Sequence, residues 1–344
     1  MQHGKKILVI GATGSMSRYL IPILVDNGCK VDGISLDNVE SSNSNIRYIK
    51  ADADDYGTFQ KILEPGYDAV VDFMVYPTWK LFPFLPYVVE HTGHYVFLSS
   101  YRVYDNKELP LCEDSPRLLD TGDDIMLRNS DDYSVYKSRG ENILRALPRK
   151  NWTIVRPAIT YSFMRYQLVT LEAHLTVARA FAGKKTVLPE AARDVKATMT
   201  WGGDVAAMIG KLLFNENAFG KIFNVCTAEY HTWGEIAAYY HDLCGLEPVW
   251  VDTEQYLRIL NPDADEKVFH WQLLYDRLFD RVMDNRRILA ATGMEQKSLK
   301  PLYDGLKMEI AKLGGTFPEL TPYQRQCDER MDLLLREIQS GQLK

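Results

Sequence analysis

A short apolar run that ends in a glycine-rich turn, KKILVIGATGSMSRYL, constrains the fold of this chain more than any other segment. Residues 7–10 are all apolar, which is typical of a parallel strand buried on both faces. Gly11 permits a tight turn, and Gly14 lets the main chain approach a pyrophosphate. A helix expected to begin near Ser15 and Met16 would offer its N-terminal amides to that anion. The segment therefore predicts the first strand, turn and helix of a dinucleotide-binding sheet.

The residue that follows the second expected strand indicates which dinucleotide would bind. Ser17 takes the third small position of the turn, where close packing of helix against strand is needed and serine is tolerated. Apolar residues between 31 and 36 lead to Asp37, at about the 20-residue spacing of an acidic residue that binds the adenosine ribose. A carboxylate there repels a 2′-phosphate, and no Lys or Arg follows in NVESSNSN. NAD is favoured over NADP, and the alternative is that Asp37 caps a surface loop.

Tyr133 and Lys137 stand four residues apart in DDYSVYKSRGEN. Residues i and i+4 share one face of a helix, so a phenol and an ammonium group can serve one site. A nearby lysine charge favours the phenolate form of a tyrosine and makes it a usable base near neutral pH. An isolated match of this kind is more often ordinary packing, and it gains weight here from the glycine-rich turn about a hundred residues upstream.

The order of six segments resembles the extended short-chain dehydrogenase/reductase family, of the NAD-dependent epimerase/dehydratase type. These segments are GATGSMS, IKADADD, YDAVVDFM, YVFLSSYRVY, YSVYKSRGE and TIVRPAI, and the resemblance covers essentially the whole chain. It implies an α/β fold in which a Rossmann doubly wound parallel sheet carries a smaller, mixed α/β C-terminal substrate lobe. It also implies a catalytic triad of Ser100, Tyr133 and Lys137.

The resemblance implies further site residues. Those that would contact the cofactor NAD are Gly11, Thr13, Gly14, Ser15, Met16, Asp37, Asp52, Ala53, Phe73, Met74, Tyr133, Lys137 and Pro157. Those that would contact substrate are Ser100, Tyr101, Arg102 and Arg193, although Arg193 could equally be a solvated loop charge. Related 4,6-dehydratases and decarboxylases carry acidic residues at the positions of Tyr101 and Arg102, and this departure lowers both possibilities. The chain also departs from the family at Tyr161, Ser162 and Phe163, where a tyrosine, a glycine and a proline are common. This departure leaves the substrate class open.

Domain boundaries and long helices follow from the same patterns. We expect an NAD-binding domain over residues 1–160 with later returns near 200–230, and a substrate lobe over 161–344. Helices are predicted over 232–245, ending at Gly245, and over 323–343 at the C-terminus. Apolar residues at helical spacing from Phe269 to Val282 predict another helix that packs in a core. The resemblance also implies a homodimer that pairs helices near 81–91 and 133–147, with Phe82, Leu85, Val88 and Val89 as an apolar stripe.

Composition excludes several classes of protein. The 344 residues are 46% hydrophobic and 25% charged with a net charge of −6, which gives no broad attraction to nucleic acid or to an anionic membrane. No apolar stretch approaches the roughly 20 residues of a membrane span, and no signal peptide is visible. Five scattered cysteines without a CxxC pair favour reduced thiols and a cytoplasmic location. His91 and His94 have no clustered ligands, so no metal is expected.

The triad predicts a reaction type. Tyr133 would take the proton of a sugar hydroxyl while the carbon beneath gives a hydride to NAD, and Ser100 would hold the oxygen. We expect an NAD-dependent epimerase whose substrate is a sugar, most simply a nucleotide sugar. If the ketone leaves the site, the protein is instead a dehydrogenase, or a keto-sugar reductase in reverse. A non-catalytic NAD- or RNA-binding member of the superfamily is the remaining alternative.

Overall fold

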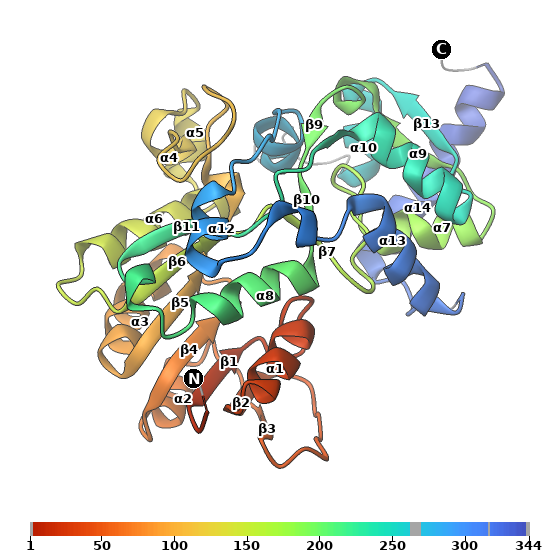
Figure 1. Cartoon of the computed structure of the whole chain (residues 1–344). Helices are drawn as coiled ribbons and strands as arrows, with labels where there is room; N and C mark the ends of the chain where they lie inside the picture. The colour runs from red at the N-terminus through yellow and green to blue at the C-terminus, as the bar shows by residue number, and fades with distance from the viewer. Residues whose placement is uncertain (1–2, 262–269, 316, 342–344) are drawn as a thin grey trace. The chain divides into compact units, whose positions relative to one another are not determined.

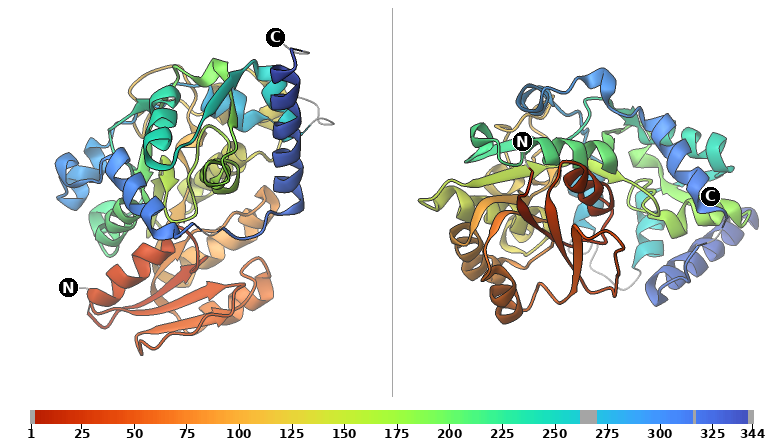
Figure 2. Two further views of the ribbon diagram at one scale, coloured as in Figure 1. Left: turned by 90° about the vertical axis from the view of Figure 1, so that its right-hand side faces the viewer. Right: turned by 60° about the horizontal axis from the view of Figure 1, so that its bottom comes forward.

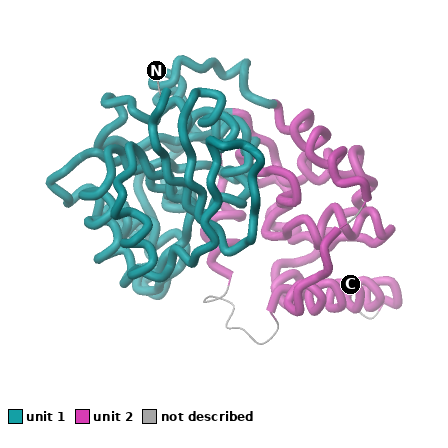
Figure 3. The backbone as a smooth tube through the Cα atoms, turned by 90° about the horizontal axis from the view of Figure 1, so that it is seen from below, with its two compact units in different colours: residues 1–160, 200–228, 283–300 teal, residues 161–199, 229–282, 301–344 magenta. Residues whose placement is uncertain are grey.

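The computed structural model describes residues 3–261, 270–315 and 317–341. The chain divides into two compact units, drawn in different colours in Figure 3. Unit 1 comprises residues 1–160, 200–228 and 283–300, and unit 2 comprises residues 161–199, 229–282 and 301–344. The segment 283–300, which sequence analysis placed in the C-terminal lobe, thus belongs to unit 1. No helix among the described residues is both long and apolar enough to cross a bilayer.

The core of unit 1 is a seven-stranded sheet in which every recorded pairing is parallel (Figure 1). Its strands are β1 (Lys6–Ile10), β2 (Lys30–Ser35), β3 (Ile46–Lys50), β4 (Tyr67–Asp72), β5 (Thr92–Leu98), β6 (Trp152–Arg156) and β11 (Lys221–Asn224), in the order β3-β2-β1-β4-β5-β6-β11. The direction of winding reverses between β1 and β4. In open α/β sheets, ligands bind outside the carboxyl ends of the strands at such a switch point.

Helices cover both faces of this sheet, as Figures 1 and 2 show. One face packs against α1 (Ser17–Asp26), α8 (Gly202–Leu212) and α12 (Arg286–Thr292), and the other packs against α2 (Tyr56–Leu63), α3 (Thr78–Glu90) and α6 (Tyr133–Ala146). The strands are apolar on both faces because both are covered, for example at Ile7, Leu8 and Val9, which are fully buried. Short helices complete the unit: η1 (Tyr101–Val103), α4 (Leu118–Thr121), α5 (Ile125–Asn129), η4 (Glu216–Ala218) and η6 (Gln296–Ser298).

Unit 2 is a mixed α/β unit. Its strands are β8 (Thr186–Pro189), β9 (Lys196–Ala197), β12 (His231–Thr232) and β13 (Pro248–Val251), with β13 parallel to β8 and β12 antiparallel to β9. Its helices are α7 (Val177–Phe181), α9 (Trp233–Cys244), α10 (Thr253–Leu260), α13 (Leu302–Ile310) and α14 (Pro322–Gln339), with η2 (Ala173–Leu175), η3 (Glu190–Ala192) and η7 (Ala311–Leu313). Two short strands, β7 (Ile159–Tyr161) and β10 (Met199–Trp201), fall where the chain passes from one unit to the other.

Local sequence signals explain where the helices of unit 2 begin and end. Thr232 and Glu235 form a reciprocal capping box at the start of α9, and Gly245 ends it with a φ of 75°. This confirms the predicted helix over 232–245. At the C-terminus α14 ends at Gln339, four residues before the predicted end, and Leu343 lies outside the described residues.

The predicted helix from Phe269 to Val282 is confirmed over residues 271–277, which are helical, and is wrong beyond them, because the helix ends before Val282. Phe269 lies outside the described residues, and the segment that follows forms a π-helical turn, η5 (Leu273–Arg277), which is not continued to Val282. Buried charges explain the irregular backbone. Asp276 pairs with both Arg277 and Arg281, and all three side chains are almost completely buried. The apolar periodicity on which the prediction depended carries no information about this ion cluster.

Candidate functional site

The glycine-rich turn after β1 has the geometry of an anion-binding turn. Gly11 has a φ of 77°, which residues with a side chain rarely adopt, and the main-chain N–H of Gly14 donates to the Gly11 carbonyl at 3.0 Å. Helix α1 begins at Ser17 with Met16 as its N-cap, so the predicted start near Ser15 and Met16 is too early by one to two residues. The amides of the first turn of a helix have no acceptor within the helix and attract anions.

Ser17, the third small residue of the glycine-rich turn, makes a hydrogen bond that the sequence pattern did not reveal. Its hydroxyl is fully buried and donates to the Gly11 carbonyl at 2.6 Å. The same residue thus packs helix α1 on β1 and holds the turn closed. A Cβ atom at Gly14 would stand 3.1 Å from the Gly11 carbonyl oxygen, so this position is tight for any larger residue. The residues present therefore fit the close approach of a pyrophosphate.

Asp37 lies beside this turn, just beyond the end of β2. The Thr13 hydroxyl donates to the Asp37 carboxylate at 2.7 Å, and the Ser35 hydroxyl donates to it at 3.2 Å. The Asp37 side chain is otherwise exposed to solvent. A carboxylate held at the carboxyl end of β2 is where a dinucleotide fold places the acceptor for ribose hydroxyls. The capping contacts from Thr13 and Ser35 orient the carboxylate without burying it.

The other predicted cofactor residues follow the ends of β3 and β4. Asp52 is exposed and Ala53 is buried in the core between the sheet and α2 and α3. Phe73 and Met74 approach the turn after β1, because a Cβ atom at Gly11 would lie 3.5 Å from the Phe73 Cβ and 3.9 Å from the Met74 sulfur. The ends of β1 and β4 thus meet at the switch point.

Contacts through Arg102 link Ser100 to Tyr133 and Lys137 at the carboxyl ends of β4 and β5. Ser100 follows β5, is buried, and accepts a hydrogen bond from the Arg102 main-chain N–H at 3.2 Å. Tyr133 opens α6 and is half-buried. The Lys137 ammonium lies 5.7 Å from the centre of the Tyr133 ring, and the Arg102 guanidinium lies 5.1 Å from it. The phenol therefore faces two cations.

Lys137 is 1% exposed, and the tertiary structure determines its environment. Its ammonium donates to the carbonyls of Met74 at 3.0 Å and of Leu98 at 2.6 Å, which tie the helix to the ends of two strands. Burial lowers the pKa of Lys137 to about 8, although the negative charges of Asp72 and Glu141 favour its protonated form. A lysine with this pKa remains a proton donor near neutral pH.

Asp72 is a buried carboxyl that sequence analysis missed. It is the last residue of β4, and its oxygens accept hydrogen bonds from the Met74 main-chain N–H at 2.9 Å and from the Tyr95 hydroxyl at 2.8 Å. Burial raises the pKa of Asp72, and these hydrogen bonds and the Lys137 charge oppose the rise. Since Lys137 donates to the carbonyl of Met74, one peptide segment joins the acid to the lysine. The only sequence signal was an acid that ends an apolar strand, YDAVVD.

A second buried acid, Glu141, was also missed. It lies one helical turn after Lys137, is fully buried, and binds Arg156 through both oxygens at 2.8 and 2.6 Å. Arg117 donates to it at 3.0 Å and the Ser99 hydroxyl at 2.5 Å. Burial alone would raise the pKa of Glu141, but these cations and hydrogen bonds lower it to about 2. The charged cluster fixes α6 against the residue before Ser100.

The predicted substrate residues and Pro157 are placed as follows. The main-chain N–H of the buried Tyr101 donates to the carbonyl of Pro157 at 3.1 Å, so η1 is attached to the end of β6. Arg193 belongs to unit 2, where it is exposed, pairs with Glu190 at 3.4 Å and lies over the ring of Trp250 at 5.5 Å. A role for Arg193 in binding substrate remains a prediction.

The histidine pair has a structural explanation. His94 is buried in unit 1 and accepts the Phe214 main-chain N–H at Nδ1, so its proton lies on Nε2, 2.9 Å from the Thr153 hydroxyl. Burial accordingly lowers the pKa of His94 to about 4. Within residues 3–261, 270–315 and 317–341, no group of three or more His, Cys, Asp or Glu side chains is arranged to hold a metal ion.

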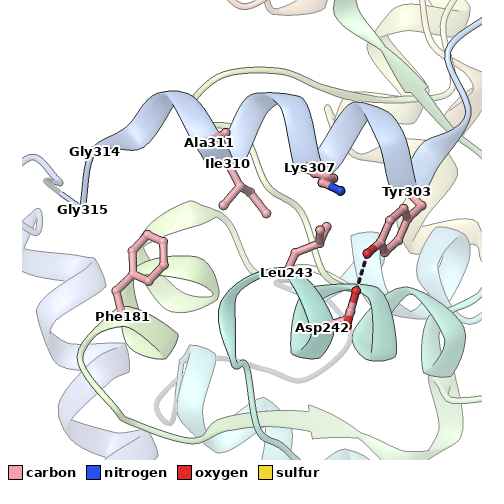
Figure 4. A pocket seen from close by; sticks show the side chains of 9 residues that line it. All are labelled: Phe181, Asp242, Leu243, Tyr303, Lys307, Ile310, Ala311, Gly314 and Gly315. Carbon is pink, nitrogen blue, oxygen red and sulfur yellow. Dashed lines mark hydrogen bonds between the residues drawn. The ribbon is translucent and has the colours of Figure 1, made fainter.

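A pocket of about 560 Å³ lies within unit 2, between α9 and α13 (Figure 4). Its lining residues are Phe181, Asp242, Leu243, Tyr303, Lys307, Ile310, Ala311, Gly314 and Gly315. The Tyr303 hydroxyl donates to the Asp242 carboxylate on one side of it. None of the residues predicted to bind cofactor or substrate lines this pocket.

The strand order and the turn after β1 are those of a doubly wound dinucleotide-binding sheet. No family model matches the sequence. No curated protein matches it significantly either.

Three solved structures illustrate the likeness. A UDP-glucuronic acid 4-epimerase from Bacillus cereus, in complex with NAD, has a TM-score of 0.68 at 16% identity over 92% of this chain and 99% of its own. A dTDP-glucose 4,6-dehydratase from Bacillus anthracis, also with NAD, has a TM-score of 0.67 at 16% identity over 96% and 100%. An epimerase from Methanothermobacter thermautotrophicus has a TM-score of 0.65 at 15% identity over 97% and 95%. This likeness confirms the predicted fold.

Proposed function

We propose that this protein is an NAD-dependent enzyme that epimerises a sugar, with a nucleotide sugar as its substrate. The observation that carries the proposal is the meeting of Ser100, Tyr133 and Lys137 at the carboxyl ends of β4 and β5, in a sheet whose first turn fits a pyrophosphate. The solved structures that share the fold include a nucleotide-sugar epimerase and a dehydratase in complex with NAD, which supports the same cofactor here.

Each triad residue has a defined role in this proposal. Tyr133 takes the proton of the sugar hydroxyl, and Ser100 donates a hydrogen bond to the same oxygen. Lys137 supplies the positive charge that favours the phenolate of Tyr133. NAD, when bound, would supply reversible hydride chemistry at the sugar carbon, and epimerisation requires the ketone to turn within the site so that its other face is reduced. The turn after β1 would hold the pyrophosphate, and Asp37 would hold the adenosine ribose.

The residues after Ser100 favour epimerisation over dehydration. Elimination of water requires an acid and a base at the neighbouring carbon in addition to the triad. The two residues that follow Ser100 are Tyr101, which is buried, and Arg102, which is a cation beside Tyr133. Neither side chain has a carboxyl group that could act as this acid or base. A simple redox exchange with a keto sugar uses the same triad and is the second candidate.

Ligand release and turnover test the proposal. The purified protein is denatured and its ligands are identified by mass spectrometry, and the native protein is then incubated with UDP-, dTDP- and GDP-hexoses. An epimerase converts one sugar into its epimer without net change in NADH. A reductase or dehydrogenase changes NADH stoichiometrically, and a binding protein leaves every sugar unchanged, so each of these results would contradict epimerisation.

We predict that the protein binds NADH more tightly than NADPH. The exposed carboxylate of Asp37 would accept hydrogen bonds from a free ribose and would repel a 2′-phosphate. Fluorescence titration with both nucleotides measures the preference, and Asp37→Ala should narrow it. Asp55→Ala is the matched control, because Asp55 only caps the N-terminus of α2. Equal or tighter binding of NADPH by the unmodified protein would show that Asp37 does not contact the ribose.

We also propose a homodimer that pairs α3 and α6 of two copies. The predicted apolar stripe needs correction, because Leu85, Val88 and Val89 are buried in the core of unit 1 whereas Phe82 is 62% exposed. The outward apolar surface of α3 consists instead of Phe82 and Trp79, which is 68% exposed. Exposed large apolar side chains on one helix are typical of an interaction surface.

The oligomeric state tests this proposal. Light scattering at micromolar concentration should give twice the mass of the chain, and Phe82→Glu should shift the protein to the monomer by placing a charge in the interface. Ile125→Glu on α5 is the control, because Ile125 is 68% exposed but lies on neither helix. A monomeric unmodified protein, or a dimer insensitive to Phe82→Glu, contradicts the pairing of α3 helices.

A further inference from the structure

Arg102 stands in the candidate site at a position where its charge acts on Tyr133. Its guanidinium carbon lies 5.1 Å from the centre of the Tyr133 ring, and its side chain is only 13% exposed. Cation–π attraction strengthens as the pair is removed from water. It also strengthens when the ring carries a negative charge, because the ring of a phenolate is more electron-rich than that of a phenol. The contact therefore favours the ionised form of Tyr133 over the neutral one.

The backbone around Arg102 holds this contact in register with the triad. The main-chain N–H of Arg102 donates to the Ser100 hydroxyl at 3.2 Å, so the arginine is anchored to the residue that would hold the substrate oxygen. Its guanidinium lies 3.6 Å from the carboxylate of Asp132, the N-cap of α6. Since Asp132 directly precedes Tyr133, one turn of chain fixes the arginine and the tyrosine relative to each other. Arg102 thus connects Ser100 to Tyr133.

We infer that Arg102 is a positioning residue for Tyr133, which stabilises the phenolate and thereby sets the pH above which the tyrosine can take a proton from substrate. The inference rests on the proposed role of Tyr133 as the base. In this arrangement Lys137 and Arg102 share the task that the lysine is expected to perform alone. The position after Ser100 and Tyr101 then serves proton transfer itself and does not bind substrate.

The other charges around Tyr133 determine how far Arg102 can shift the ionisation of this tyrosine. On α6, the ring faces Lys137 and the buried phenol of Tyr136, and the carboxylate of the N-cap residue Asp132 pairs with Arg102. Asp131 is paired with Arg139 and bonded to Thr78. Behind Lys137 lie the carboxylates of Asp72 and Glu141, which act on the lysine.

Asp132 offsets part of the arginine charge. An opposite charge within about 4–6 Å shifts the ionisation of a group by about 1–3 pH units, and the partly neutralised Arg102 should fall at the low end.

The test measures the ionisation of Tyr133 directly in the protein with NAD bound. Tyrosinate absorbance is recorded against pH, and the curve of a Tyr133→Phe variant is subtracted so that only Tyr133 contributes. Arg102→Gln should raise the midpoint of this titration by about one pH unit. Arg102→Lys keeps the charge but replaces the planar guanidinium by an ammonium group, so it should give an intermediate midpoint. Arg145→Gln is the matched control for loss of one positive charge, because Arg145 is exposed near the far end of α6.

The pH dependence of turnover separates this role from others. If Arg102 acts through the phenolate, Arg102→Gln should lower kcat about tenfold near neutral pH, and the loss should disappear at high pH where Tyr133 is ionised in both proteins. A loss of equal size at every pH would show a structural role and overturn the inference. A raised KM with an unchanged titration midpoint would show substrate binding and would also overturn it.

Failure of the inference differs from failure of the proposed function. The spectroscopic titration needs no sugar. A shifted midpoint in a protein that turns over no sugar would leave the action of Arg102 on Tyr133 established and would contradict the proposed activity. An active epimerase whose midpoint is unchanged by Arg102→Gln would retain its proposed function and would contradict the inference.

Discussion

Tyr133→Phe should reduce turnover of the true substrate by on the order of a hundredfold or more, the usual scale for a positioned general base. The change removes only the hydroxyl of a half-buried ring, so the melting temperature should change little. NAD should still bind, because the turn after β1 and Asp37 are untouched. The measurement is kcat for the confirmed substrate, together with NADH titration and thermal unfolding.

Tyr136→Phe is the matched control for this variant. Tyr136 lies on the same helix with its ring 5.4 Å from that of Tyr133, and its hydroxyl is buried without a hydrogen-bond partner among the described residues. Removing an unsatisfied buried hydroxyl should leave activity intact and stability equal or higher. Near-normal activity of Tyr133→Phe would show that Tyr133 is not the catalytic base. The alternative of a non-catalytic binding protein would then be favoured.

Lys137→Met should reduce both turnover and NAD affinity, and turnover should fall at least as far as in Tyr133→Phe. In the proposed function, the ammonium would supply charge to the phenol and a hydrogen bond to the nicotinamide ribose. Kinetic assays and NADH titration measure the two losses separately. Lys211→Met on α8 is the control, because that lysine is exposed and its helix packs on the other face of the sheet from α6.

A stability measurement separates lost chemistry from a lost fold in this variant. Lys137→Met removes the cation near the buried Asp72 and leaves the carbonyls of Met74 and Leu98 without their donor, so thermal stability should fall. Adding Asp72→Asn removes the uncompensated charge and should recover part of the stability but none of the activity. Recovery of activity by the double variant would contradict a chemical role for Lys137.

The fold and part of the site could be predicted because their signals are local in sequence. An apolar run, a glycine with positive φ and a helix start are decided within a few residues, and they marked the turn after β1 correctly apart from the exact start of α1. Tyr133 and Lys137 are four residues apart, and helix geometry alone predicts that they share one face of α6. The helix ending at Gly245 was confirmed for the same reason.

The sequence by itself determined the parallel sheet, its dinucleotide-type turn and which side chains share the face of α6. The tertiary structure alone decided that Asp72 and Glu141 flank Lys137, that Arg102 lies over Tyr133, and that residues 283–300 return to unit 1. The physical reason is that periodicity records which residues are apolar and how far apart they stand along the chain. A buried charge is tolerated only beside its partner, and the partner of Glu141 is Arg156, which comes from β6 and which no local pattern identifies.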